Sequence, residues 1–186
     1  MNNPEQQEIP VTSAATPAAH ILVDVDHFEF DHPFIALQAV VVFARERGSG
    51  RCVGSLFMER KRDGNTLFIA AIQVDEASRR MGVGRALLMH AKSLADNRGL
   101  SVEAGIYPEN KASYKLFRHE LFRLEDVYIN SSNGKTAALM EWPRKTFPTA
   151  PPYDEFVEMV QKRLRDHQEY EKQRAAAQVG AEGGVA

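Results

Sequence analysis

The stretch that decides the fold reads Val74-Asp75-Glu76-Ala77-Ser78-Arg79-Arg80-Met81-Gly82-Val83-Gly84-Arg85-Ala86-Leu87-Leu88. A strand-like run ends at Val74, and from Val83 the apolar residues recur every three to four positions, as in a helix. Gly82 and Gly84 stand at this junction, where they let the backbone approach a ligand and leave the N–H groups of the first helical turn free. The positive end of the helix dipole and the three arginines attract an anion. The sequence therefore predicts a phosphate or pyrophosphate site here.

Two nucleotide-binding motifs also contain glycines at similar spacing, and the sequence can be compared with each of them. A dinucleotide-binding unit requires G-x-G-x-x-G, but Leu87 occupies the place of the third glycine. The later Gly134-Lys135-Thr136 resembles the end of a phosphate loop, yet Ile129 stands where its first glycine belongs. Both nucleotide interpretations fail. What is left is an anion site of another kind, or a tight turn flanked by solvated arginines.

Outward from this junction, periodicity and turn residues predict one mixed α+β (α/β) domain. The expected strands are Ile21 to Phe30, Leu37 to Arg47, Cys52 to Lys61, Thr66 to Val74, Ser101 to Tyr107, Phe122 to Ser132 and Lys135 to Trp142. The expected helices start near Val83, at Asn110 and near Tyr153. We expect the first helix to end at Gly99 and Asn110 to cap the second, while Asn133-Gly134 predicts a hairpin turn.

The two ends of the chain differ in composition from the middle. Residues 1–20 lack periodicity and contain three prolines, which predicts a disordered leader before a domain over 21–148. Residues 149–186 are expected to form a Pro-rich connector and an amphipathic helix that is frayed from Gly180 onward. Phe156, Val160 and Leu164 form a narrow apolar stripe on that helix, so it should lie against its own domain or against a second subunit. A homodimer is one arrangement that this stripe allows.

Composition excludes several classes of protein. The 186 residues carry a net charge of -2, which argues against bulk nucleic-acid binding and against an anionic membrane surface. The single cysteine, Cys52, excludes an intramolecular disulfide, and the six histidines show no zinc-ligand spacing, so no metal is expected. The sequence has neither a secretory signal nor an apolar run long enough to cross a bilayer. We therefore expect a cytoplasmic protein without membrane partners.

Two segments together resemble the GNAT superfamily of acyl-CoA-dependent N-acetyltransferases. The superfamily signature R/Q-x-x-G-x-G/A appears as Arg79-x-x-Gly82-x-Gly84 after the aliphatic strand end Ile72-Gln73-Val74, and a later N-x-x-A-x-x-L-Y-x-x-x-G-F segment corresponds to Asn110 to Phe122. The resemblance covers about residues 37–142. It implies a mixed, mostly antiparallel central sheet with flanking helices and a splayed strand pair that binds acyl-CoA. It also implies transfer of an acetyl group from acetyl-CoA to a primary amine by direct attack.

The resemblance carries binding roles onto individual residues. Arg79 to Arg85 would cradle the pyrophosphate, the backbone of Ile72 and Val74 would pair with the pantetheine arm, and Asn110 and Phe117 would flank the thioester. The expected set that binds the cosubstrate is therefore Ile72, Val74, Arg79, Arg80, Met81, Gly82, Val83, Gly84, Arg85, Asn110 and Phe117.

Departures from the family pattern concern the catalytic groups. The family commonly has a tyrosine general acid at the position of Phe117, and phenylalanine has no proton to give. No Asp or Glu occurs from Thr66 to Val74, although a carboxylate on that strand often serves these enzymes as base. Glu103, Tyr107, Tyr114 and Tyr128 could replace these groups. Tyr107 and Glu103 are the catalytic candidates because they share one face of a strand. Leu121 also stands in place of a usual glycine.

The acceptor and the activity itself are left open by the sequence. Between Phe30 and Leu37 there is room only for a turn around His32-Pro33, where family members insert helices that wall the acceptor side. We therefore expect the acceptor groove to be open, or closed by another subunit or by the helix after Tyr153. An open groove favours a large acceptor such as a protein, although a small amine is also allowed. The competing hypothesis is a non-catalytic module that keeps acyl-CoA binding, or only the fold, and serves in assembly or regulation.

Overall fold

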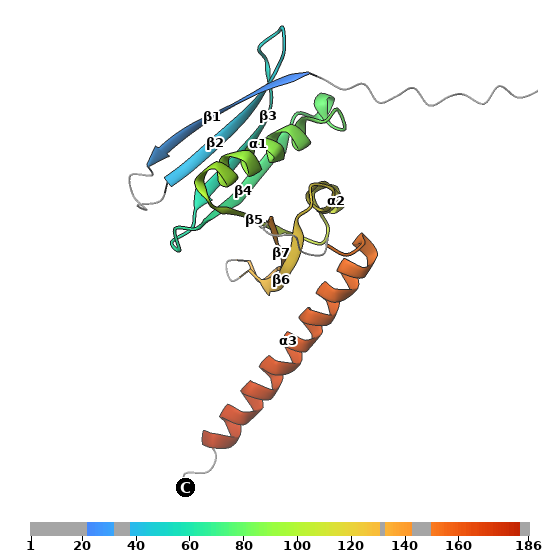
Figure 1. The fold of residues 1–186 in the computed structure, drawn as a ribbon. Coiled ribbons are helices and arrows are strands. Elements are labelled where there is room, and N and C mark those ends of the chain that lie inside the picture. The colour runs from blue at the N-terminus through green and yellow to red at the C-terminus, as the bar shows by residue number, and fades with distance from the viewer. Residues whose placement is uncertain (1–21, 32–37, 131–132, 143–149, 183–186) are drawn as a thin grey trace, which may run out of the picture.

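The computed structural model describes residues 22–31, 38–130, 133–142 and 150–182 (Figure 1). The elements run β1 (Val23–Asp31), β2 (Gln38–Glu46), β3 (Cys52–Arg60), β4 (Thr66–Val74), a 3-10 turn (Glu76–Ser78), α1 (Val83–Arg98), β5 (Ser101–Ile106), α2 (Lys111–His119), β6 (Arg123–Ile129), β7 (Thr136–Trp142) and α3 (Tyr153–Glu182). This order of strands and helices is the predicted one. The predicted leader over 1–20 and the turn around His32-Pro33 lie outside the described residues.

The strands form one seven-stranded sheet in the order β1-β2-β3-β4-β5-β7-β6. Every neighbouring pair is antiparallel except β4 and β5, which run parallel. A parallel pair requires a crossover connection, and α1 supplies it. The expected mixed, mostly antiparallel sheet with flanking helices is confirmed.

One face of the sheet carries the helices and the core. On β2 the side chains of Val40, Val42 and Ala44 are buried and belong to the same apolar cluster as the inner side of α1. The residues between them point to the other face, which no helix covers within the described part of the chain. There Phe28 is 61% exposed and Phe30 is 42% exposed. The sheet therefore has a packed face and an open face.

Strand β4 pairs with β5 over only half of its length. The parallel ladder runs from Thr66 opposite Ser101 to Ile69 opposite Ala104 and then stops. On its other side β4 shifts register against β3, so that Ala70 is an extra residue. Such a bulge bends a strand and increases its local twist. Beyond Ala70, β4 and β5 therefore diverge, as the family resemblance implied.

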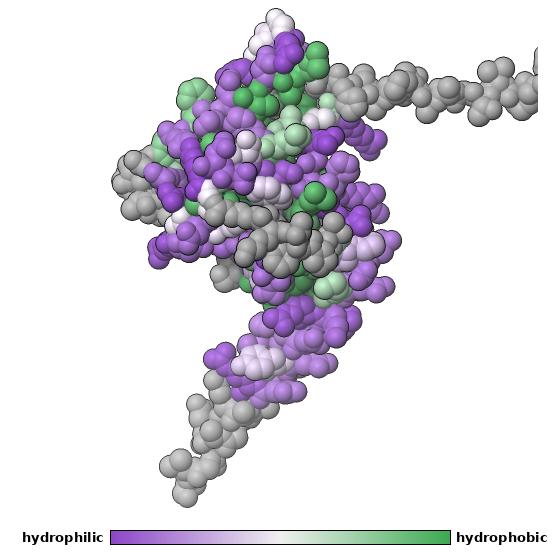
Figure 2. Space-filling view, in the orientation of Figure 1, coloured by the Kyte–Doolittle hydropathy of each residue, from purple (hydrophilic) through white to green (hydrophobic). Residues whose placement is uncertain are grey.

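Helix α3 is docked at its start and projects from the domain thereafter (Figure 1). Phe156 is fully buried and stacks on Tyr114 of α2 with ring centroids 4.0 Å apart. Val160 is also buried, whereas every residue from 165 to 175 is exposed. The coloured part of the projection is mostly hydrophilic (Figure 2). The helix is assigned to Glu182, and the predicted fraying of the chain end stays a prediction.

None of the helices in the described ranges is long and apolar enough to span a membrane.

Candidate functional site

A cavity of about 1020 Å³ opens along the diverging half of β4. Its walls come from the start of β3, the end of β4, the 75–82 loop, the first turn of α1 and the first turns of α2. It is lined by Cys52, Gly54, Ser55, Ile72, Gln73, Val74, Asp75, Arg79, Arg80, Gly82, Val83, Gly84, Arg85, Asn110, Ala112, Ser113 and Leu116. Nine of the eleven residues expected to bind the cosubstrate line it, since only Met81 and Phe117 are missing from this lining.

The loop before α1 has the backbone of an anion cradle. Arg80 and Gly82 both adopt positive φ, at 63° and 88°. Gly82 is the N-cap of α1 and provides no side-chain cap, so no side chain there blocks the N–H groups of the first turn. Alternating right- and left-handed residues turn successive N–H groups into one concavity, which binds phosphate oxygens well. Because Arg80 is not a glycine, its left-handed backbone is strained.

The three arginines at this loop differ in their partners. Arg79 donates to the carbonyl of Val74 at 3.4 Å, and Arg85 Nε lies 3.0 Å from Glu120 Oε1. Arg80 is exposed and forms no ion pair with any residue that the structure describes. Arg80 is therefore the arginine whose charge is most available to a bound phosphate.

Glu120, at the end of α2, forms ion pairs with two basic side chains of α1. Its side chain is 6% exposed and contacts Lys92 Nζ at 3.0 Å as well as Arg85. Burial alone would raise the pKa of Glu120, but the hydrogen bonds from Lys92 and His119 and the charges of Lys92 and Arg85 outweigh it and lower the pKa. Glu120 is thus ionised and holds α2 against α1.

The second helix places its own N-terminus at the cavity. Asn110 caps α2 by accepting a hydrogen bond from the Ser113 N–H at 3.1 Å, as predicted. Gly84 of α1 packs against this helix so closely that a Cβ there would lie 3.0 Å from Leu116 Cδ2. The two helices thus approach through a glycine at the cavity wall.

Phe117 does not border the cavity. Its side chain is 2% exposed and packs edge-to-face on Phe122, with ring centroids 4.8 Å apart. The structure therefore places Phe117 in the core, and its expected position beside a thioester stays a prediction. The sequence motif alone could not show this, because a helix position does not reveal how deeply its ring is buried. Tyr114 is also buried and donates to the carbonyl of Pro151 at 2.8 Å.

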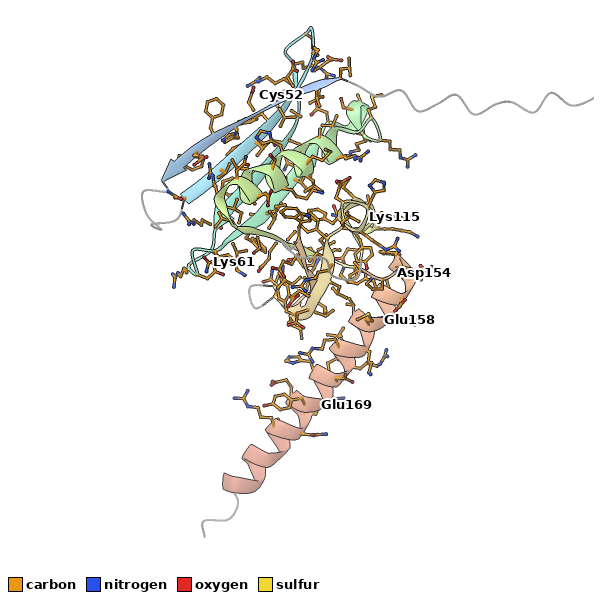
Figure 3. All side chains as sticks on the ribbon, viewed as in Figure 1. Cys52, Lys61, Lys115, Asp154, Glu158 and Glu169 are labelled. Atoms are coloured by element: carbon orange, nitrogen blue, oxygen red, sulfur yellow. The ribbon has the colours of Figure 1, made fainter. Side chains whose placement is uncertain are left out.

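The two catalytic candidates lie on the open face. Tyr107 directly follows β5, where β4 and β5 have separated, and its hydroxyl accepts hydrogen bonds from Asn130 Nδ2 and Asn133 Nδ2, each at 3.0 Å. Glu103 lies on β5, four residues before Tyr107 and on the same face. Its side chain is 13% exposed and accepts a hydrogen bond from Lys61 Nζ at 2.6 Å. Figure 3 places Lys61 and Cys52 at opposite ends of β3, so this ion pair lies away from the Cys52 end of the cavity.

Several lining residues were missed by the sequence analysis. Gly54 is one of them: a Cβ there would lie 2.9 Å from the Gln73 carbonyl and 2.9 Å from Val83 Cγ1, so only glycine lets β3 pass beneath α1. Ser55 and Gln73 also reach the cavity, from the open face. Strand alternation could have indicated their shared face, but the pairing of β3 with β4 was needed to place them at the cavity.

No group of three or more metal-ligating side chains occurs in the part of the chain that the structure describes.

Comparison with known proteins identifies the family. Residues 13–121 match the model of the acetyltransferase (GNAT) family, and because this match spans more than half of the chain, the chain belongs to that family. Comparison with curated proteins gives no match.

Solved structures agree in fold. A Bacillus anthracis protein assigned as a streptothricin acetyltransferase, solved in complex with acetyl coenzyme A, is 18% identical over 57% of this chain and 64% of its own, with a TM-score of 0.51. An assigned acyl-CoA N-acyltransferase from Klebsiella pneumoniae is 16% identical over 56% of this chain and 72% of its own, with a TM-score of 0.50. At these identities the likeness concerns the fold alone.

Proposed function

We propose that the protein transfers an acetyl group from acetyl-CoA to a primary amine by direct attack. The observation that carries this proposal is the cavity along the free half of β4, which has the anion cradle of Arg80 and Gly82 at one end and the separated strands along its side. A long thioester with a pyrophosphate fits such a site. The amine nitrogen attacks the thioester carbonyl carbon, the C–S bond breaks, and the CoA thiolate leaves.

Each part of the cavity has a separate task in this reaction. The N–H groups around Gly82 and the guanidinium of Arg80 would bind the pyrophosphate. The edge of β4 at Ile72 and Val74, which has no strand partner in β5, would pair with the pantetheine amides as an added strand does. An unpaired N–H on this edge can also stabilise the oxyanion as the amine attacks.

Tyr107 is the proposed general acid in place of Phe117. Its oxygen already accepts two amide hydrogen bonds, so the phenol hydrogen is left to point elsewhere, towards the leaving sulfur. Glu103 is the proposed base. Lys61 holds the Glu103 carboxylate within the paired part of β4 and β5, one residue before their ladder ends at Ala104, so the proton from the amine would reach Glu103 through water.

Calorimetry with acetyl-CoA, followed by assay of CoA release with a panel of primary amines and mass spectrometry of the products, tests the function. We expect saturable acetyl-CoA binding, and Gly84→Val should weaken it severely because the new side chain meets Leu116 and fills the cavity wall. Arg80→Ala removes one charged contact, worth about 1–2 kcal/mol. No binding at hundreds of micromolar, or unchanged binding by Gly84→Val, would contradict the assignment.

The buried position of Phe117 and the absence of an acid from β4 favour a second candidate. In this candidate the protein binds acyl-CoA without catalysis and acts in assembly or regulation. Saturable acetyl-CoA binding with no acetylated product from any amine would support it over the enzyme.

A further inference from the structure

Gly105 lies on the open face of β5, directly beside the place where β4 and β5 separate. A Cβ built on this glycine would lie 2.5 Å from the hydroxyl oxygen of Tyr128 and 3.6 Å from Phe68 Cζ. Real Cβ atoms do not tolerate the first distance, so the tyrosine hydroxyl occupies the space that a side chain at this position would fill. Gly105 is therefore required for the present position of Tyr128.

Tyr128 reaches this place from two strands away. It belongs to β6, which pairs with β7 through Tyr128 opposite Ala137, and β7 in turn pairs with β5 through Leu139 opposite Gly105. Small side chains at Ala137 and Gly105 form the floor beneath the ring. The Tyr128 side chain therefore extends across β7, and its hydroxyl lies beside the strand gap, the place after Ala104 where β4 and β5 separate.

The surroundings of this hydroxyl are polar on one side and aromatic on the other. Burial raises the pKa of Tyr128, and the neighbouring Tyr107 and Glu103 raise it further against the opposing charge of Lys61. The phenol is therefore neutral at physiological pH. A neutral phenol oxygen can accept an N–H from an amine, and Phe68 gives the amine's carbon chain an apolar contact.

The packed face of the sheet is closed to an incoming amine. Helix α1 covers it, and the acyl-CoA cavity lies at the first turns of α1 and α2. The open face carries no helix in the described residues and presents Phe68, Gly105 and Tyr128 at the strand gap. We propose that the Tyr128 hydroxyl, placed by Gly105, binds and orients the acceptor amine.

This inference rests on the proposed acetyl transfer and adds an acceptor subsite to it. The ligand is a primary alkylamine whose nitrogen donates to Tyr128 Oη while its first carbons contact Phe68. Tyr128 is then an acceptor-binding residue, and Gly105 is a positioning residue that acts through Tyr128.

A double-mutant cycle on Gly105 and Tyr128 tests the proposal. With an amine that the wild type acetylates, Tyr128→Phe should raise the acceptor KM about 3- to 10-fold, as expected for one lost hydrogen bond. Gly105→Ala should raise it similarly, because the new methyl displaces the hydroxyl. In the Tyr128→Phe background the methyl should add little, since the ring carbon Cζ lies 3.7 Å from the Cβ position, an ordinary contact.

The controls separate this inference from the proposed function. Tyr170→Phe makes the same chemical change on the exposed part of α3 and should leave the acceptor KM unchanged. All four variants should bind acetyl-CoA as the wild type does in calorimetry. An unchanged acceptor KM in Gly105→Ala, or effects that simply add in the double variant, would overturn the subsite while leaving acetyl transfer intact. A wild type that acetylates no amine overturns both.

Discussion

Arg85 and Glu120 are joined by a 3.0 Å ion pair that links the first turn of α1 to the end of α2. The same carboxylate accepts from Lys92, about two helical turns further along α1. Glu120 therefore fixes the relative position of the two helices that border the cavity. It also occupies the guanidinium of Arg85, so we expect Arg85 to contribute less than Arg80 to phosphate binding.

Replacing Glu120 tests its role as a clamp. Glu120→Gln should lower the free energy of unfolding by about 1–3 kcal/mol, because a buried group that receives charged hydrogen bonds loses its charge. Urea denaturation followed by circular dichroism measures this. Glu158→Gln, on the exposed side of α3, is the matched control and should unfold as the wild type does. Equal midpoints for the two variants would argue against the clamp.

Two substitutions of Arg80 separate the effect of its charge on acetyl-CoA binding from the effect of its strained backbone on stability. Arg80→Ala and Arg80→Gly should both weaken acetyl-CoA binding roughly tenfold, because both lose the same guanidinium. The glycine variant should be more stable than the alanine variant by about 1 kcal/mol, since glycine adopts the 63° φ without strain. Calorimetry and thermal melting give the two quantities. Arg85→Ala should weaken binding less than either, and a larger loss there would contradict this ranking.

Tyr107→Phe tests the proposed general acid. We expect kcat to fall about a hundredfold while the acetyl-CoA Kd is unchanged, because a positioned acid contributes on the order of 10²–10⁴-fold. Asn133→Ala should cause a smaller fall, since Asn130 still holds the hydroxyl. Phe117→Tyr should not raise turnover, because that ring is in the core. Full activity of Tyr107→Phe would return the residue to a packing role.

We expect His90 to make the stability of the fold depend on pH. Its Nε2 lies 3.1 Å from His27 Nδ1, and burial, followed by the charge of His27, lowers the pKa of His90 despite the opposing effect of Asp26. The unfolded chain therefore takes up a proton near pH 6.5 that the folded chain does not, so stability falls as the pH is lowered through this value. Melting temperatures between pH 7.5 and 5 should fall less in His90→Gln than in the wild type. His167→Gln, on exposed α3, should behave like the wild type.

The two parts of α3 should contribute unequally to stability. Phe156→Ala should cost about 3–5 kcal/mol, because the fully buried ring stacks on Tyr114. Deleting residues 166–186 should leave the melting temperature unchanged, because the described residues from 166 to 175 are all exposed. Light scattering on the same samples shows whether the projecting part joins two subunits. A lower melting temperature after the deletion would show that this part packs on the domain.

Local patterns predicted the elements well, because their causes are local. The run Thr66–Val74 was predicted with both of its ends, and Gly99 ends α1 in the left-handed conformation as expected. Helix α2 stops at His119, and Leu121 takes a φ of 65°, the conformation that the family's glycine would adopt more easily. Boundaries of this kind depend on a single backbone angle that side-chain periodicity does not report.

What sequence patterns could not provide is the pairing across the sheet. The order β5-β7-β6 places Tyr128 at the strand gap, although the chain between Gly105 and Tyr128 includes all of α2. Burial of Phe117 and the engagement of Arg85 by Glu120 likewise depend on how α2 packs on α1. The anion cradle could be predicted because its residues are neighbours in the sequence, whereas the proposed acceptor side is built from strands that are far apart in the chain.

The extra residue at Ala70 divides β4 into halves with different amide environments. Backbone N–H groups that face β5 are held in a ladder from Thr66 to Ile69, and those further along have no strand partner there. In deuterated water, amides of the first half should exchange through global unfolding, whereas the unpaired amides of the second half should exchange within the native state. The bulged residue thus marks a boundary on this strand. Before it, the β4 amides that face β5 are protected from exchange by the sheet, and after it only a ligand bound in the cavity would protect them.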